Sequence, residues 1–179
     1  YTKLLHSFDN TDTAKVGGNV TKVGTAAYST AQKKFGTHSL LLDGDSDYVT
    51  LPDSASWDFG SGDFAIDCWV RFSVLPTGGD GDGIISQWDG ANNCATILYL
   101  TGNAGVYQLV FGYTTNGVAG TIAARSWTVT PVVDTWYHIA VVRSGNNLNL
   151  FWNGTKDTTA LDMTGKTIFN STDTLHIGY

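Results

Sequence analysis

The chain has 179 residues, which is enough for one β-sandwich domain with its own core, so we expect a single domain over residues 1–179. Its 10 basic and 16 acidic residues give a net charge of −6, and this charge would repel a phosphate backbone, so we predict no nucleic-acid partner. No apolar run approaches the roughly 20 residues of a membrane-spanning helix, so we predict no membrane insertion.

Short apolar alternations between turn signals predict an all-β chain. Turn signals recur about every 10 to 12 residues, which is typical of antiparallel sheets. Residues 53–60 are expected to make one helical turn that places Trp57 as a plug at one end of the sandwich. We predict strands at residues 3–8, 38–44, 47–52, 63–73, 83–88, 95–101, 106–114, 120–129, 136–143, 148–152 and 174–179.

Two segments carry the clearest strand signals. In residues 63–73 the alternation puts five side chains on a face that meets the opposing sheet. Residues 136–143 and 148–152 form a hairpin around a Gly-Asn-Asn turn, which Asn153 and Gly154 close at the far end. The predicted core-facing residues are Phe64, Ile66, Cys68, Val70 and Phe72, with Asp67, Trp69 and Arg71 on the other face; Trp57, Trp69, Trp136 and Trp152 are assigned to structure.

Residues 36–52, 57–72, 134–155 and 175–179 together resemble, in order and spacing, the laminin-G-like domains of the concanavalin A-like lectin/glucanase superfamily. The resemblance implies an all-β fold, a two-sheet antiparallel β-sandwich of the jelly-roll type. Such modules mostly bind sugars or other surfaces, and only some catalyse. They occur in secreted polysaccharide-processing proteins and in bacteriophage surface and tail proteins.

In one respect the sequence departs from the family pattern. Members continue past the strand at 174–179 into an acidic closing strand, and none follows here. We therefore expect the sandwich to lack its closing C-terminal strand. Three explanations stay open: the chain is cut short, it is part of a larger protein, or a neighbouring chain completes the sandwich edge.

Catalysis is not expected, because glucanases of this superfamily rely on paired glutamates and every acidic residue here is aspartate. The four histidines lie within strand patterns, and no nucleophile elbow precedes a helix. Cys68 and Cys94 are too few for a disulfide framework, so we expect two buried, inert thiols, with a bridge between them as the alternative.

Calcium is the one cofactor that the sequence suggests. Asp43, Asp45 and Asp47 alternate in a tight turn and offer the hard oxygen ligands that Ca²⁺ prefers. In related domains a structural Ca²⁺ lies between this loop, the N-terminal loop and the final acidic strand, which would recruit Asp9 or Asp12 here. The alternative is a solvated turn in which aspartates bond to their own backbone.

Two segments mix aromatic and hydrogen-bonding residues in the way that sugar sites do. Trp88, Asp89, Asn92 and Asn93 lie in a loop at a strand end, and Arg125 and Trp127 share one face of a strand. The alternative is that both tryptophans cap the core.

The sequence therefore predicts a non-catalytic, lectin-like module that binds a glycan or cell-surface polysaccharide. It would be displayed outside the cell or on the surface of a virus or phage particle. The competing prediction is a structural or adhesion domain of a virion, phage tail or capsid surface protein, whose ligand is another protein.

Overall fold

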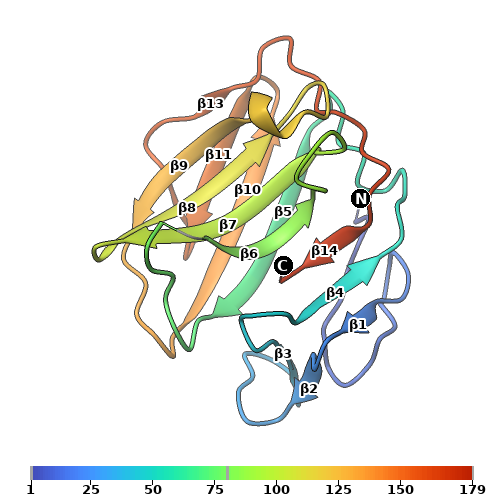
Figure 1. Cartoon of the computed structure of the whole chain (residues 1–179), viewed down its shortest axis with the longest axis vertical. Coiled ribbons are helices and arrows are strands. Elements are labelled where there is room, and N and C mark those ends of the chain that lie inside the picture. Colours follow the sequence, from blue (N-terminus) through green and yellow to red (C-terminus); the bar gives the residue numbers. More distant parts are fainter. Residues whose placement is uncertain (1, 80, 179) are drawn as a thin grey trace.

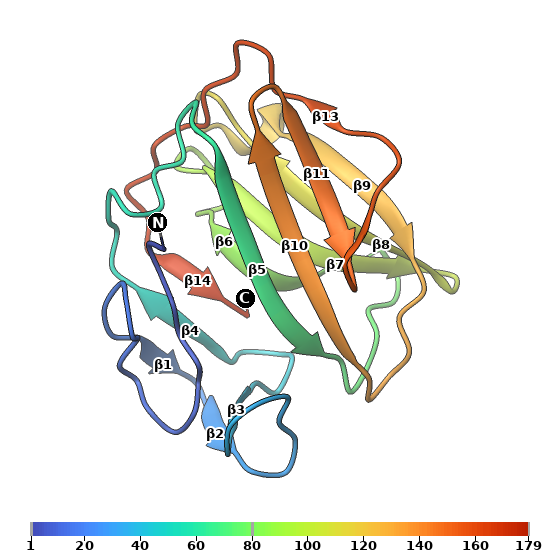
Figure 2. The same cartoon turned by 180° about the vertical axis from the view of Figure 1, so that it is seen from behind.

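Side-chain alternation along strand β5 (Phe64–Arg71) decides how the two main layers meet. The computed structural model describes residues 2–79 and 81–178. Phe64, Ile66, Cys68 and Val70 point into the core, while Ala65, Asp67 and Trp69 are exposed on the opposite face, as predicted. The inner row packs against side chains of a second sheet, which makes a β-sandwich (Figures 1 and 2).

The larger sheet has seven strands, all antiparallel, and faces the viewer in Figure 1. This sheet contains the strands predicted at 47–52, 83–88, 95–101, 106–114, 120–129 and 174–179, and the last of them lies between two other strands. Its strand order is β1 (Thr21–Val23), β4 (Tyr48–Leu51), β14 (Leu175–Ile177), β6 (Gly81–Gln87), β7 (Thr96–Asn103), β8 (Val106–Tyr113) and β9 (Ala123–Val129).

The smaller sheet faces the viewer in Figure 2 and is built on the predicted hairpin. Asn153 and Gly154, both with positive φ, turn the chain between Trp152 and Thr155, as Asn-Gly turns do. Its order is β12 (Thr155–Lys156), β11 (Asn147–Trp152), β10 (Trp136–Ser144) and β5, with β13 (Leu161–Asp162) also against β11; β2 (Ala27–Ser29) and β3 (Ser39–Leu41) form a separate two-stranded sheet.

The core has two parts. The larger cluster lies between the two sheets, and the smaller one lies under β1, β4 and β14. Phe59 and Ile85 contact both clusters, so the apolar interior is continuous. Fully buried members of the larger cluster include Leu98, Leu100, Leu109, Phe111, Ile139, Leu148 and Leu150. The buried residues of the smaller cluster include Val49, Leu51, Trp57 and Leu175.

Some predicted elements differ from the structure. Residues 3–8 form no strand, because Leu5 makes only an isolated bridge to Val16. Residues 53–60 form a turn closed by a bond from the Trp57 N–H to the Ser54 carbonyl, rather than a helix, although Trp57 is buried as expected. The helical element described is the short 3₁₀ turn at Ala119–Thr121.

The strands predicted at 38–44 and 47–52 belong to different sheets, so they continue around a corner instead of pairing. Tyr179, in the last predicted strand, lies outside the described residues. Both cysteines are free, as expected. Burial raises the pKa of the Cys68 thiol to about 12, which leaves it inert. Within the described ranges no helix has the length and apolarity to cross a membrane.

Candidate functional site

The outer face of the smaller sheet carries a group of partly exposed aromatic side chains. Trp69 on β5 lies directly opposite His138 on β10, and Trp136 lies opposite Arg71. The Trp69 and His138 rings are 5.3 Å apart, and 37% of Trp69 is exposed. An indole that stands on an outer sheet face is available to a ligand, since the core is on the other side of the sheet.

A loop from the N-terminal third closes one side of this aromatic group. Residues 30–38 connect β2 to β3, and Figure 2 shows that hairpin beside the end of β5. The Lys34 ammonium nitrogen lies 4.1 Å from the centroid of the Trp69 ring, a cation–π contact. The Phe35 ring meets Trp69 edge-on at 5.8 Å.

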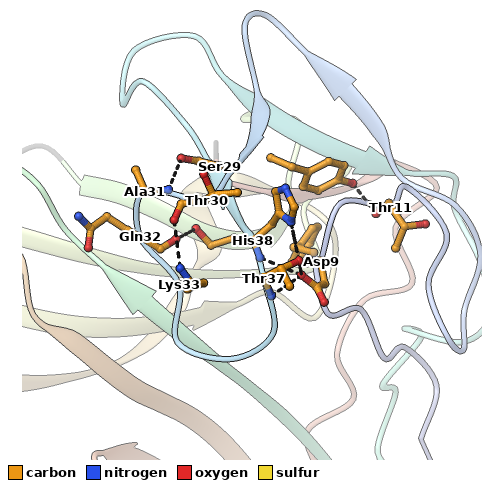
Figure 3. Close-up of polar contacts among 12 residues, drawn as sticks. Asp9, Thr11, Ser29, Thr30, Ala31, Gln32, Lys33, Thr37 and His38 are labelled. Carbon is orange, nitrogen blue, oxygen red and sulfur yellow. Dashed lines mark hydrogen bonds and ion pairs between the residues drawn. The ribbon is translucent and has the colours of Figure 1, made fainter.

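Asp9 anchors this loop, as Figure 3 shows. Its Oδ1 accepts hydrogen bonds from the Thr37 N–H at 2.7 Å, the Thr37 hydroxyl at 2.7 Å and the His38 N–H at 2.8 Å. These bonds favour the charged carboxylate, so the Thr37 hydroxyl and the two N–H groups lower the pKa of Asp9 to about 2. The loop that carries Lys34 is therefore fixed from a distant part of the chain.

Residues of the sheet face and of the loop 30–38 line an open cup of about 470 Å³, which we call the outer-face cup. Its volume falls within the range of small-ligand sites. Besides the two indoles it contains a cation, an imidazole and an amide, which suits recognition of a ring with hydroxyl groups. The lining residues are Lys34, Trp69, Trp136, His138, Asn153 and Gly154.

Part of the polar surface of the cup is held in place by the sheet. The Asn153 Oδ1 accepts a hydrogen bond from the His138 N–H at 2.9 Å, and the His138 carbonyl accepts one from the Asn153 N–H at 2.8 Å. The His138 Nε2 lies 3.5 Å from the Asp67 carboxylate. The imidazole and amide are thus positioned by backbone pairing and by a neighbouring side chain.

The predicted loop of Trp88, Asp89, Asn92 and Asn93 lies elsewhere, after β6. Asp89 accepts bonds from the Ala91 and Asn93 N–H groups, and these hydrogen bonds lower its pKa. The Asn93 amide bonds to the hydroxyl and N–H of Thr172. Two of the four predicted groups therefore hold the loop together; Trp88 is half-buried and Asn92 is exposed.

Arg125 and Trp127 share a face of β9, as predicted, but it is the inner face. Trp127 lies opposite Leu109 and packs against the larger core cluster. The Arg125 Nε donates to Asp157 Oδ2 at 2.6 Å, and the Asp157 side chain is fully buried. The structure does not bring these two residues together with the Trp88–Asn93 loop into one site.

Three of the predicted calcium ligands, Asp43, Asp47 and Asp9, accept hydrogen bonds from other parts of the chain. Asp43 Oδ1 accepts bonds from the N–H groups of Asp45, Ser46 and Asp47, which cap its own turn and lower its pKa. The buried Asp47 carboxylate binds Thr25 and the Asp43 N–H, and Asp9 holds the loop described above. Over residues 2–79 and 81–178 no group of three or more such ligands is placed to hold a metal ion.

Sequence reasoning assigned Trp69 and Trp136 to structure and missed the cup. The signal was present in part, because Trp69 alternates with the core residues of β5 and so had to lie on the outer face. Lys34 gave no such signal, since its approach to Trp69 depends on a loop anchored by Asp9.

Comparison with solved structures supports the jelly-roll assignment. Domain 4 of AbnA, a GH43 extracellular arabinanase from Geobacillus stearothermophilus solved with arabinotriose, matches with a TM-score of 0.66 at 17% identity, covering 98% of this chain and 82% of that one. Residues 221–444 of an S-layer domain-containing protein from Clostridium thermocellum match with a TM-score of 0.52 at 24% identity, covering 92% and 76%. These likenesses show a shared fold.

A search among curated proteins gives no match. Residues 43–179 match the family described as the concanavalin A-like lectin/glucanases superfamily, whose description joins sugar-binding and sugar-cleaving proteins. Because the match spans most of the chain and the sandwich agrees with it, this protein belongs to the concanavalin A-like lectin/glucanase superfamily.

Proposed function

We propose that this protein is a non-catalytic carbohydrate-binding module that holds a glycan in the outer-face cup. The observation that carries the proposal is the placement of Trp69 and Trp136 beside the His138 and Asn153 polar groups in one open hollow. Indoles stack on the apolar faces of sugar rings, while amide and imidazole groups bind hydroxyls. The arabinotriose complex of the arabinanase domain is consistent with a glycan ligand for this fold.

The cup's chemistry favours binding over cleavage. Glycoside hydrolysis needs two carboxyl groups on either side of the scissile bond. The described residues that line the cup include no carboxylate, and the sequence contains no glutamate. Asp67, beside His138, is two-thirds exposed, and a solvated carboxylate is poorly suited to act as a general acid.

The test is a soluble-polysaccharide panel, including arabinan and arabinotriose, read by affinity electrophoresis and calorimetry. Trp69→Ala and Trp136→Ala should each weaken binding about tenfold or more, because an aromatic anchor contributes at least about 1.4 kcal/mol. Urea unfolding of each variant confirms that the fold is kept.

Trp88→Ala is the matched control, because it removes an indole from the other predicted site. It should bind glycan like the unchanged protein. Binding that survives both cup variants but is lost with Trp88→Ala would move the site to the Trp88–Asn93 loop. A panel that gives no binding at all would overturn the proposal.

A second function is favoured by the free side of β5, which pairs with β10 but with no other strand in the described part of the chain. Such an eight-residue edge can accept a strand from a neighbour. In this proposal the module is a structural or adhesion domain at the surface of a virus or phage particle. If this is the function, no polysaccharide of the panel should bind, and the β5 amides should be protected from hydrogen exchange in the assembled particle.

A further inference from the structure

Two cations near the cup or its supporting loop are neutralised by an aspartate. Arg71, opposite Trp136, pairs with Asp134 at 2.6 Å. Lys22, whose ammonium lies 4.3 Å from the centroid of the Tyr28 ring on β2, pairs with Asp12 at 2.6 Å. Cations at these positions therefore have little charge left to offer a ligand.

Lys34 differs from them. Its ammonium lies over the Trp69 face inside the cup, and none of the ion pairs found among the described residues includes it. A cation–π contact fixes the position of an ammonium but does not cancel its charge. The ammonium keeps N–H donors that can point away from the ring, into the cup.

The Lys34 position is also built into the fold. Three residues after Lys34 the chain is held at Thr37 and His38 by Asp9 (Figure 3), so the loop is fixed close to Lys34 in the sequence. The loop is further closed by the Ser39 hydroxyl, which donates to the Gln32 carbonyl at 2.5 Å. A positive charge held in place in an aromatic hollow is a recognition element for an anion.

We infer that the cup selects an acidic saccharide, whose ring stacks on Trp136 and whose anionic substituent meets the Lys34 ammonium. The inference rests on the proposed function, since it concerns the ligand of the same cup. Asp67, which lies 3.5 Å from His138 Nε2, is an opposing charge on the same face of the sheet. The net charge of −6 also repels acidic polymers, but salt screens charges beyond about 8 Å. The local contact with Lys34 should therefore determine whether an acidic saccharide binds more tightly than a neutral one.

The test uses polygalacturonate, alginate and glucuronan, each also in its carboxyl-reduced, neutral form, with a sulfated galactan as a separate arm. At least one acidic polymer should bind about fivefold more tightly than its reduced form, the size of an exposed charge pair. Lys34→Met should remove that advantage and Lys34→Arg should keep it. Preference for sulfate over carboxylate, with the same dependence on Lys34, identifies a sulfate ester as the substituent.

Lys33→Met is the matched control, because it removes the same charge from the adjacent residue, whose ammonium bonds to the Thr30 carbonyl outside the cup. It should leave the advantage intact, and Asp67→Asn should increase it. The inference is overturned if acidic and reduced polymers bind equally or if the advantage survives Lys34→Met. Neutral glycans that still bind through Trp136 would then leave the proposed function standing.

Discussion

At the scale of single residues, two Arg–Asp pairs of equal length lie in different surroundings. The Arg125–Asp157 and Arg71–Asp134 contacts both measure 2.6 Å, but the Asp157 side chain is fully buried whereas that of Asp134 is 60% exposed. Coulomb attraction is weakly screened in the interior, and an unpaired buried charge is costly. Burial, rather than the distance between the charged groups, should therefore determine how much each pair contributes to the free energy of unfolding.

Arg125→Met should lower the free energy of unfolding by about 3 kcal/mol, because it leaves the Asp157 carboxylate buried without its cation. Arg71→Met should change it by less than about 1 kcal/mol. Urea titration followed by circular dichroism measures both. Equal losses in the two variants would contradict this reasoning, and glycan binding by Arg125→Met should remain, since Arg125 lies outside the cup.

The alternation in residues 123–129 correctly put Arg125 and Trp127 on one face of a strand. Which face it is depends on pairing with β8, where Leu109 and Phe111 oppose them. The partner Asp157 is also distant in sequence. The local pattern therefore predicted which residues share a face of the strand. The role of Arg125 could not be predicted in this way, because it depends on pairing with β8 and on the distant Asp157.

At the scale of elements, the predictions that rested on strong local signals were correct, whereas the position of a segment held by a distant residue could not be predicted. The β10–β11 hairpin was predictable because its turn residues and alternation lie within the same 20-odd positions. The loop 30–38 carries no such pattern, and its position follows from Asp9, 28 residues before Thr37. The sheet side of the cup could thus be predicted from the alternation along β5, but the position of the loop that forms its other side could not.

The Asp9 anchor should depend on pH. A lowered pKa means that the anchor is complete above the ordinary aspartate value near 3.9 and is lost as the pH falls through about 2. Amide NMR resonances of Thr37 and His38 should therefore titrate with a midpoint near pH 2. In Asp9→Asn this titration should disappear, whereas a midpoint near pH 4 in the unchanged protein would show that the hydrogen bonds are absent in solution.

At the scale of the whole molecule, a three-residue strand joins the first fifty residues to the rest. β14 pairs with β4 on one side and with β6 on the other, so among the described residues it alone joins the two parts of the seven-stranded sheet (Figure 1). Its place in the sheet could not be predicted from sequence, because its pairing partners lie about 90 and 125 positions away and no local pattern identifies them. Leu175 is also buried in the smaller core cluster.

Leu175→Ala should therefore lower the free energy of unfolding of the whole domain by about 3 kcal/mol, as for other buried leucines. A single transition should remain in calorimetry and in tryptophan fluorescence, since Phe59 and Ile85 connect the two core clusters. Leu41→Ala is the control: that side chain is 56% exposed on the separate two-stranded sheet, so the loss should stay within about 0.5 kcal/mol. An early, separate transition in Leu175→Ala would instead mean that β1 and β4 fold independently of the larger core.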